Sequence, residues 1–453
     1  PPHERQKPPS RPIVPCFGGC VKEGTAASGR LVRSCHAEIV ILAGLMLAAS
    51  LSNGHPLLDY LSATRPDVHA EVGAIGRHTR LDFSSQTWQG IEWTHTVVWV
   101  EPIVRSAPDT AVLEITGGEP NTADIRMAES TARGTGLPVA VLFQIPNQPI
   151  WGLSEDELIA HSFEKAAETG DQTWPLLFPM VRSAVVAMDV LQRQGRLAGK
   201  PMEKFIATGA SKRGWTTWLL GASGDRRLVG IAPRVIDVLD FPAQMRHQLE
   251  SWGEYSPMIE AYTKRGLPQR IAEQAVAKVG QMVDPYVLRD RIQVPTMVVT
   301  GTNDAYWTVD ATSLYWDGLS QPKWSWVEPN AGHGMGDRAL RLPALRSFFR
   351  SRAGLFAMPL VWGSVQQESA SLSAEWNCSV PLRRVRIWSA ERPDRRFDQA
   401  LWRIVATRIR PAQSGRVKIA RNGRYQAAFV EFWPEIDGED VRLTIPVRLF
   451  GPK

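Results

Sequence analysis

Ser211 has the sequence surroundings that a nucleophilic serine needs. It lies in residues 208–215, Thr-Gly-Ala-Ser-Lys-Arg-Gly-Trp, between an apolar run and a run with helical character. A serine hydroxyl attacks efficiently when a sharp strand-to-helix turn exposes it and a histidine accepts its proton. The usual pattern, G-x-S-x-G, is altered here, because Arg213 takes the place of the second glycine and Gly214 follows it. The alternative is a glycine-rich turn that contains a serine without a chemical role.

Two later segments supply an acid and a base in a suitable order. Residues 294–300 are an apolar run typical of a buried parallel strand, and Asp304 follows it. Residues 324–328 predict another strand, and His333 follows that one. Ser211, Asp304 and His333 therefore have the chain order of an α/β-hydrolase triad, each just past the carboxyl end of a predicted strand.

The elements that must position these residues alternate between strand and helix. This alternation predicts an α/β fold, an α/β-hydrolase-like doubly wound and mostly parallel sheet. Residues 240–290 contain few strand signals and predict a helical cap inserted between two strands. The remaining expected strands are 93–100, 111–116, 139–144, 204–208 and 228–238, with helices at 121–134 and 176–194.

Changes in composition divide the chain into three parts. Residues 1–54 are expected to form a disordered tail with a signal-like apolar segment. Residues 55–355 are expected to form the α/β-hydrolase domain. Residues 356–453 contain short alternating runs separated by turn residues, which predict a small antiparallel β-sandwich-like domain.

The apolar run at residues 39–51 indicates export. It follows Arg30 and Arg33, ends in small residues and is too short to span a bilayer comfortably. It resembles the core of a signal peptide, which places a signal-like segment near residues 36–53 and predicts a secreted or periplasmic protein without stable membrane insertion after processing. The alternative is an apolar helix packed on the domain.

The charge and cysteine content exclude several classes of function. The chain has 453 residues and a net charge of +6, but its basic residues are dispersed, so we expect no nucleic-acid partner. Three of its four cysteines lie in the first 35 residues, and no Cys/His spacing suggests zinc. We therefore expect neither a metal nor an organic cofactor. The sequence identifies neither a physiological partner nor an oligomeric state.

Several segments of the chain are distinctive: 144–149 (QIPNQP), 174–180 (WPLLFPM), 208–218 (TGASKRGWTTW), 231–238 (IAPRVIDV) and 252–256 (WGEYS). These segments resemble the PhoPQ-activated pathogenicity-related protein family. The resemblance covers roughly residues 55–450 and implies an α/β-hydrolase that is often exported and has poorly defined substrates; some relatives are discussed as secreted signalling proteins. The Gly-x-Ser-[Lys/Arg]-x-Gly turn is also similar to that of glucuronoyl esterases.

The order of the three residues predicts their roles. Ser211 would attack a carbonyl, His333 would take and return the proton, and Asp304 would orient the imidazole. Asp237, where the strand predicted within residues 228–238 ends, is an alternative acid.

The negative oxygen of the tetrahedral intermediate needs backbone donors in place beforehand. The N–H of Lys212, the residue after the nucleophile, would be one of them. Gly117 or Gly118, after an early strand, would supply the other; the loop at residues 144–147 is the rival.

Other residues near the predicted catalytic edge are candidates for binding substrate. Arg213 could pair with a substrate carboxylate, but pairing inside the fold, for instance with Asp237 or Glu114, is favoured because the turn buries this position and buried charges need partners. The aromatic candidates, which are core residues in the alternative interpretation, are Trp215, Trp252, Tyr255 and Trp307.

Together these features favour an exported serine hydrolase that acts on an ester or an amide. The substrate would be a small molecule, a peptide or a carbohydrate ester. An esterase is favoured over a peptidase, because nothing in the sequence marks a site that anchors an amine. The alternative is a non-catalytic secreted binding or signalling protein on a hydrolase scaffold.

Overall fold

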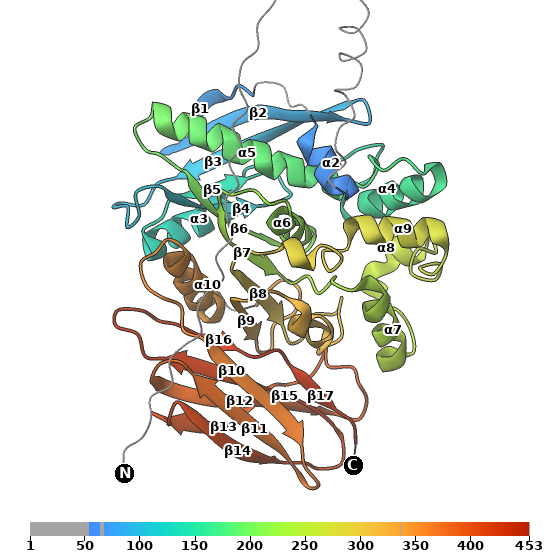
Figure 1. Cartoon of the computed structure of the whole chain (residues 1–453), viewed down its shortest axis with the longest axis vertical. Coiled ribbons are helices and arrows are strands. Elements are labelled where there is room, and N and C mark those ends of the chain that lie inside the picture. The colour runs from blue at the N-terminus through green and yellow to red at the C-terminus, as the bar shows by residue number, and fades with distance from the viewer. Residues whose placement is uncertain (1–53, 64–67, 337, 453) are drawn as a thin grey trace, which may run out of the picture. The chain divides into compact units, whose positions relative to one another are not determined.

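A single large β-sheet organises the chain. The computed structural model describes residues 54–63, 68–336 and 338–452, which lie within one compact unit. The central strands of the sheet run parallel in the order β5, β4, β6, β7, β8, β9 (Figure 1). Their bounds are β4 Thr110–Ile115, β5 Val139–Leu142, β6 Lys204–Ala210, β7 Leu228–Arg234, β8 Thr296–Gly301 and β9 Lys323–Glu328.

Helices cover both faces of these parallel strands (Figure 1). Strand β4 has apolar residues facing both ways: Leu113 is buried in the core beneath α5 and α6, whereas the adjacent Val112 is buried in the core beneath α3 and α10. Successive side chains of a strand point to opposite faces, so a strand covered on both sides needs apolar residues at every position. The α/β fold expected from the sequence is confirmed. The helices are α3 Thr122–Thr135, α5 Leu177–Leu197, α6 Lys212–Ala222 and α10 Arg338–Arg352.

A helical cap lies between β7 and β8, where the sequence predicts one. Its helices are α7 (Phe241–Trp252), α8 (Glu260–Thr263) and α9 (Gln274–Val283). Helix α9 packs against α4 (Glu155–Thr169), which precedes α5, and α2 (Pro56–Ser62) packs nearby. The buried residues of α9 recur every three or four positions, which gives the helix one apolar face. The cap and α4 together cover the carboxyl ends of the central strands.

Antiparallel strands extend the sheet on both sides. On one side β3 pairs with β5 and continues the sheet to β2 and β1; on the other side β9 pairs with the short strand β16 and leads to β15, β12 and β13. The result is a 14-stranded sheet. The added strands are β1 Glu71–Ile75, β2 His78–Trp88, β3 Ile91–Val100, β12 Leu382–Arg392, β13 Arg403–Ile409, β15 Tyr425–Pro434, β16 Leu443–Thr444 and β17 Arg448–Phe450.

A second, three-stranded antiparallel sheet packs against β15. It consists of β10 (Val361–Gln367), β11 (Ser371–Cys378) and β14 (Ser414–Ala420). The C-terminal region is therefore two antiparallel layers, but one of these layers is continuous with the central sheet through β16. The division into residues 55–355 and 356–453 stays a prediction.

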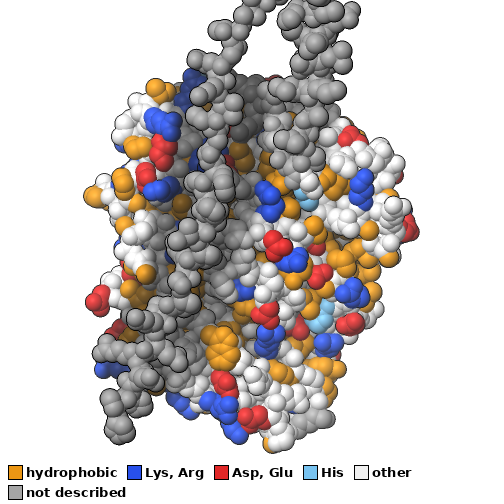
Figure 2. Space-filling view, in the orientation of Figure 1, with side chains coloured by type: hydrophobic (Ala, Val, Ile, Leu, Met, Phe, Trp, Pro, Cys, Tyr) orange, Lys and Arg blue, Asp and Glu red, His pale blue; other side chains and the backbone are white. Residues whose placement is uncertain are grey.

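The signal-like segment expected near residues 36–53 lies outside the described residues. No helix in the described part of the chain has the length and apolarity that crossing a bilayer requires. On the face drawn in Figure 2, basic and acidic side chains are intermixed, as expected for solvated surface charges.

Thr444 tests how firmly the C-terminal layer is joined to the central sheet. Its Oγ1 accepts a hydrogen bond of 2.9 Å from the backbone N–H of Val327 and lies 3.2 Å from the Ser325 hydroxyl. Thr444→Val keeps the shape of the side chain but leaves the buried N–H unpaired, so we expect a loss of about 1–3 kcal/mol in the free energy of unfolding. Urea denaturation measures this loss, and Thr444→Ser, which keeps the oxygen, is the control. A valine variant as stable as the wild type would contradict this role of Thr444.

Candidate active site

The backbone at Ser211 adopts a sharp and strained turn. Strand β6 ends at Ala210 and α6 begins at Lys212, so a single residue changes the direction of the chain. Ser211 has φ 57° and ψ −127°, a region that residues with a side chain rarely adopt. Its N–H donates to the carbonyl of Arg234 on β7, and its carbonyl accepts from the N–H of Trp215, both at 2.9 Å. These bonds tie the turn to the next strand and to the first turn of α6.

Two glycines allow the tight packing around this turn. A Cβ on Gly209 would lie 2.7 Å from the carbonyl oxygen of Arg213. A Cβ on Gly214 would lie 2.6 Å from Cγ2 of Ile236 and 2.8 Å from the carbonyl oxygen of Arg234. The close approach of β7 therefore requires glycine at position 214. This contact explains why the second glycine of the motif is displaced by one residue.

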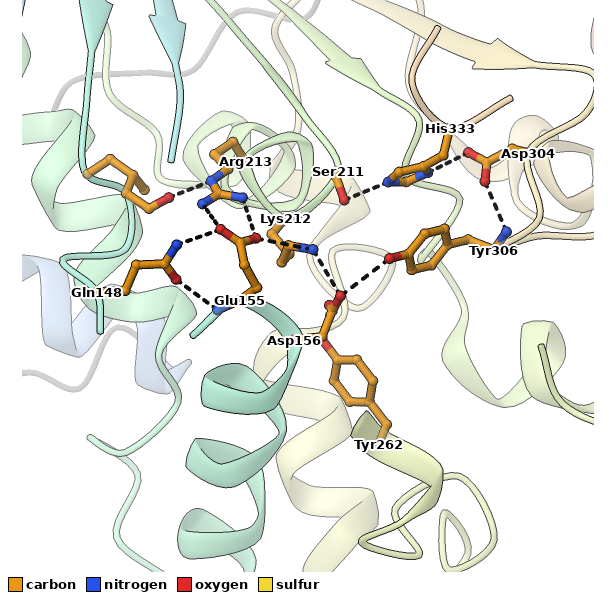
Figure 3. Close-up of polar contacts among 11 residues, drawn as sticks. Gln148, Glu155, Asp156, Ser211, Lys212, Arg213, Tyr262, Asp304, Tyr306 and His333 are labelled. Atoms are coloured by element: carbon orange, nitrogen blue, oxygen red, sulfur yellow. Dashed lines mark hydrogen bonds and ion pairs between the residues drawn. The ribbon is translucent and has the colours of Figure 1, made fainter. Parts of the chain in front are cut away.

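Ser211, His333 and Asp304 form a continuous hydrogen-bonded chain (Figure 3). Nε2 of His333 lies 2.8 Å from Oγ of Ser211, and Nδ1 lies 2.8 Å from Oδ2 of Asp304. A carboxylate only accepts hydrogen bonds, so Nδ1 carries the ring proton and Nε2 is left as the acceptor for the serine hydroxyl. The loops after β6, β8 and β9 bring the three side chains together.

Tyr306 contacts both Asp304 and His333. Its backbone N–H donates to Oδ1 of Asp304 at 2.9 Å, which leaves Oδ2 for the imidazole. Its ring lies against that of His333, with 4.1 Å between the ring centroids and 31° between the planes. The sequence analysis missed this residue, although its position two residues after Asp304 was a usable signal.

Asp237, the alternative acid, has different partners. It is buried, and it accepts hydrogen bonds from the hydroxyls of Tyr315 at 2.5 Å and Thr312 at 2.8 Å. Burial raises the pKa of Asp237 to about 6, despite these two hydrogen bonds. Strand β7 ends at Arg234, before Asp237, and the imidazole of His333 contacts Asp304 instead.

Both cations that follow Ser211 are paired with carboxylates at the start of α4 (Figure 3). Arg213 binds both oxygens of Glu155, at 2.6 and 2.7 Å, and donates from Nε to the carbonyl of Ile145 at 2.5 Å. Lys212 donates to Asp156 at 2.9 Å and lies 3.3 Å from Glu155. Arg213 is thus paired inside the fold, but the suggested partners were wrong: Glu114 pairs with Arg234, and Asp237 with hydroxyls.

The pKa of Glu155 reflects this pairing. Burial of the carboxyl group opposes its ionisation, but the hydrogen bonds and positive charge of Arg213 outweigh it, with smaller contributions from Gln148 and Lys212, and the pKa falls to about 2. Glu155 is therefore ionised at neutral pH and fixes the guanidinium in place. Sequence reasoning missed Glu155 and Asp156; two acidic residues directly after Ser154, at a helix start, were the available signal.

The candidate oxyanion donors lie at the start of α6 and in the loop after β4. The N–H of Lys212 belongs to the first turn of α6, where backbone N–H groups have no acceptor within the helix. Gly117 instead packs on Arg213: a Cβ there would lie 1.5 Å from the guanidinium. Neither Gly117 nor Gly118 is among the residues that line the cavity beside Ser211. Their role as donors stays a prediction. In the rival loop, the side chain of Asn147 donates to the carbonyl of Thr94.

A cavity extends from Ser211 and His333 beneath the cap. Of the aromatic residues expected to bind substrate, Trp215 and Trp307 line it. Trp252 and Tyr255 do not: the guanidinium of Arg396 lies 5.2 Å from the ring of Trp252, and the Tyr255 hydroxyl donates to the carbonyl of Pro268 at 3.4 Å. Residues that line the cavity but were missed include Asp156, Phe241, Tyr262 and Tyr306. Within the described residues, no group of three or more His, Cys, Asp or Glu side chains is arranged to hold a metal ion.

The strand order, the cap after β7 and the side chains at the strand ends define an α/β-hydrolase fold. The chain belongs to the PhoPQ-activated pathogenicity-related protein family, whose model matches residues 68–398. This confirms the resemblance noted in the sequence.

A curated relative and several solved structures are similar to this chain. Autocrine proliferation repressor protein A of Dictyostelium discoideum is 30% identical over 322 residues, which are 66% of this chain and 65% of that protein, so the chain spans less than two thirds of the relative. Acetyl xylan esterase 1 from Thermoanaerobacterium sp. JW/SL YS485 is 13% identical, with a TM-score of 0.46 over 66% of this chain and 92% of that one. The acetyl xylan esterase from Paenibacillus sp. R4 is 12% identical, with a TM-score of 0.47 over 65% of this chain and 92% of that one.

Gly214→Ala tests the packing that shapes the serine turn. Alanine inside a helix is ordinarily more favourable than glycine by about 1 kcal/mol. Here the added methyl group would collide with β7, so we expect the free energy of unfolding to fall by about 1–3 kcal/mol. Gly280→Ala in α9 is the matched control, because a Cβ at Gly280 meets nothing within 4 Å. Equal effects of the two substitutions in thermal unfolding would contradict this account of the displaced glycine.

Proposed function

We propose that this protein is a serine hydrolase that cleaves carboxylic esters. The observation that supports this function is the position of His333. Its Nε2 lies 2.8 Å from the Ser211 hydroxyl, and its Nδ1 lies 2.8 Å from the Asp304 carboxylate. A serine with such a partner can lose its proton as it attacks, which an isolated serine does poorly.

In the proposed mechanism, Oγ of Ser211 bonds to the ester carbonyl carbon while its proton passes to Nε2 of His333. The negative charge of Asp304 stabilises the imidazolium that forms. The ester C–O bond then breaks, and the leaving alcohol takes the proton from His333. A water molecule then gives up a proton to the same nitrogen as it attacks the acyl carbon. The bond from that carbon to Oγ of Ser211 breaks, Oγ takes the proton back from His333, and the acid is released.

The N–H of Lys212 is the proposed backbone donor to the tetrahedral oxyanion. The residue after the nucleophile commonly has this role, and the first N–H groups of a helix also carry its positive dipole end. The ammonium group of Lys212 stays with Asp156, so its contribution is to keep this turn rigid.

An ester is favoured over a peptide as the substrate. A peptidase that anchors the amine of a peptide needs an acidic side chain at the site. That side chain must not already be paired with another cation. Asp156 is the acidic residue beside Ser211 in the cavity lining, and it already binds the ammonium of Lys212 and the hydroxyl of Tyr262.

A non-catalytic signalling role is the second candidate. It is favoured by the name of the curated relative, an autocrine proliferation repressor. In that case the cavity would bind a ligand without turning it over.

A fluorophosphonate probe distinguishes the two candidates, because it forms a covalent bond with an activated serine. We expect the wild type to be labelled, Ser211→Ala not to be labelled, and Asp304→Asn to be labelled at least about 100-fold more slowly. Asp237→Asn is the matched control and should be labelled like the wild type. Folded wild-type protein that is not labelled favours the signalling role, and loss of labelling only in Asp237→Asn makes Asp237 the acid.

We also propose that the protein is exported, on the basis of the apolar run at residues 39–51 and the small residues that end it. N-terminal sequencing of the protein purified from its native host tests this proposal. The expected mature chain begins just after the run, near residue 53. A mature chain that retains residues 30–50 would refute cleavage there.

A further inference from the structure

The cavity beside Ser211 is apolar over most of its wall. It extends from Ser211 and His333 into the space between α4, α6 and the cap. An apolar wall and an apolar ligand both release water when they come together. The binding free energy that results grows with the apolar area that they bury. The side chains that form most of this wall include Phe163, Trp215, Phe241, Met245, Val279 and Val283.

The ionisable and hydroxyl side chains at the reacting end of the cavity are hydrogen-bonded to one another. Ser211 is hydrogen-bonded to His333. Asp156 accepts from Lys212 at 2.9 Å, from Tyr262 at 3.1 Å and from Tyr306 at 3.4 Å. A charged substrate group in this space would have to break these pairs and lose its own water. The cavity therefore suits an uncharged group.

The acyl part of an ester fits this space better than the alcohol part. After the first step of the proposed reaction the alcohol leaves, whereas the acyl group stays bonded to Ser211 until water releases it. A cavity beneath the cap retains a group through both steps and would slow the exit of an alcohol. The buried area, and with it the reaction rate, would therefore depend on the length of the acyl group.

We infer that the cavity beneath the cap is an acyl pocket, and that the substrates are esters of uncharged, apolar acids longer than acetate. This inference rests on the proposed hydrolase function. It adds a substrate class, an apolar acyl group, and identifies Gly280 as the position that leaves room for it. Gly280 lines the cavity from α9, and a Cβ at this position would meet nothing within 4 Å.

The test compares p-nitrophenyl acetate with p-nitrophenyl octanoate. Each methylene that enters an apolar pocket contributes roughly fourfold at most, so we expect kcat/KM for octanoate to exceed that for acetate by at least about tenfold. Gly280→Phe should lower this octanoate-to-acetate ratio by at least about tenfold, because its ring occupies the space of the chain. Lys278→Phe adds the same ring on the exposed side of α9, outside this cavity, and should leave the ratio unchanged.

A measurement on the wild type alone checks the same inference without a variant. The p-nitrophenyl monoester of octanedioic acid has an acyl chain of the same length that ends in a carboxylate. We expect its kcat/KM to be at least about tenfold below that of the octanoate ester, because the charge would have to enter the apolar end.

The outcomes separate the inference from the proposed function. If the fluorophosphonate labels Ser211 but acetate is cleaved as well as octanoate, or the charged ester as well as the neutral one, the acyl pocket is wrong and the hydrolase function stands. The acyl pocket is also wrong if Gly280→Phe is labelled normally and keeps the wild-type ratio. If neither labelling nor cleavage occurs in folded protein, the hydrolase function fails and the acyl pocket fails with it.

Discussion

The strained turn at Ser211 is the constraint on which the site depends. A residue with a side chain reaches φ 57° only at a cost of about 1–3 kcal/mol, which the surrounding contacts must offset. The hydrogen bond to the carbonyl of Arg234 and the close approach of β7 at Gly214 provide these contacts. The turn directs the hydroxyl toward His333 and begins α6 one residue later. The β6–β7 pair therefore determines where the Ser211 hydroxyl lies.

Arginine at position 213 extends this constraint to a distant segment. Its guanidinium lies in the space left by the missing side chain of Gly117 and binds both oxygens of Glu155. Lys212 binds Asp156 in the same way. Two ion pairs thus join the nucleophile turn to the start of α4, which forms one wall of the cavity. The charges balance within the protein, so this altered motif is a structural device and leaves no free cation for a substrate carboxylate.

The parallel strands and the cap contribute different properties to the site. The ends of β6, β8 and β9 bring a serine, an acid and a base within hydrogen-bonding distance, because loops at the carboxyl ends of adjacent parallel strands meet at one edge of a sheet. The cap then sets the surroundings of these groups with apolar side chains. In the proposed function, reactivity would depend on the first contribution and substrate selectivity on the second.

The sequence by itself determined the α/β fold, the helical cap and the positions of Ser211, Asp304 and His333 after strands, because these features depend on local apolar runs and the residues next to them. It did not reveal the pairing of β9 with β16, because these two strands lie more than 100 residues apart in the chain. It also did not reveal the hairpin of β1 and β2, because the mixed polar and apolar residues of these two strands carry a weak local signal. It also did not reveal the partners of Arg213, or which aromatic residues line the cavity. Tertiary structure decided the β9–β16 pairing and the partners of Arg213, because these contacts join segments more than 50 residues apart through packing and ion pairing, which no local pattern records.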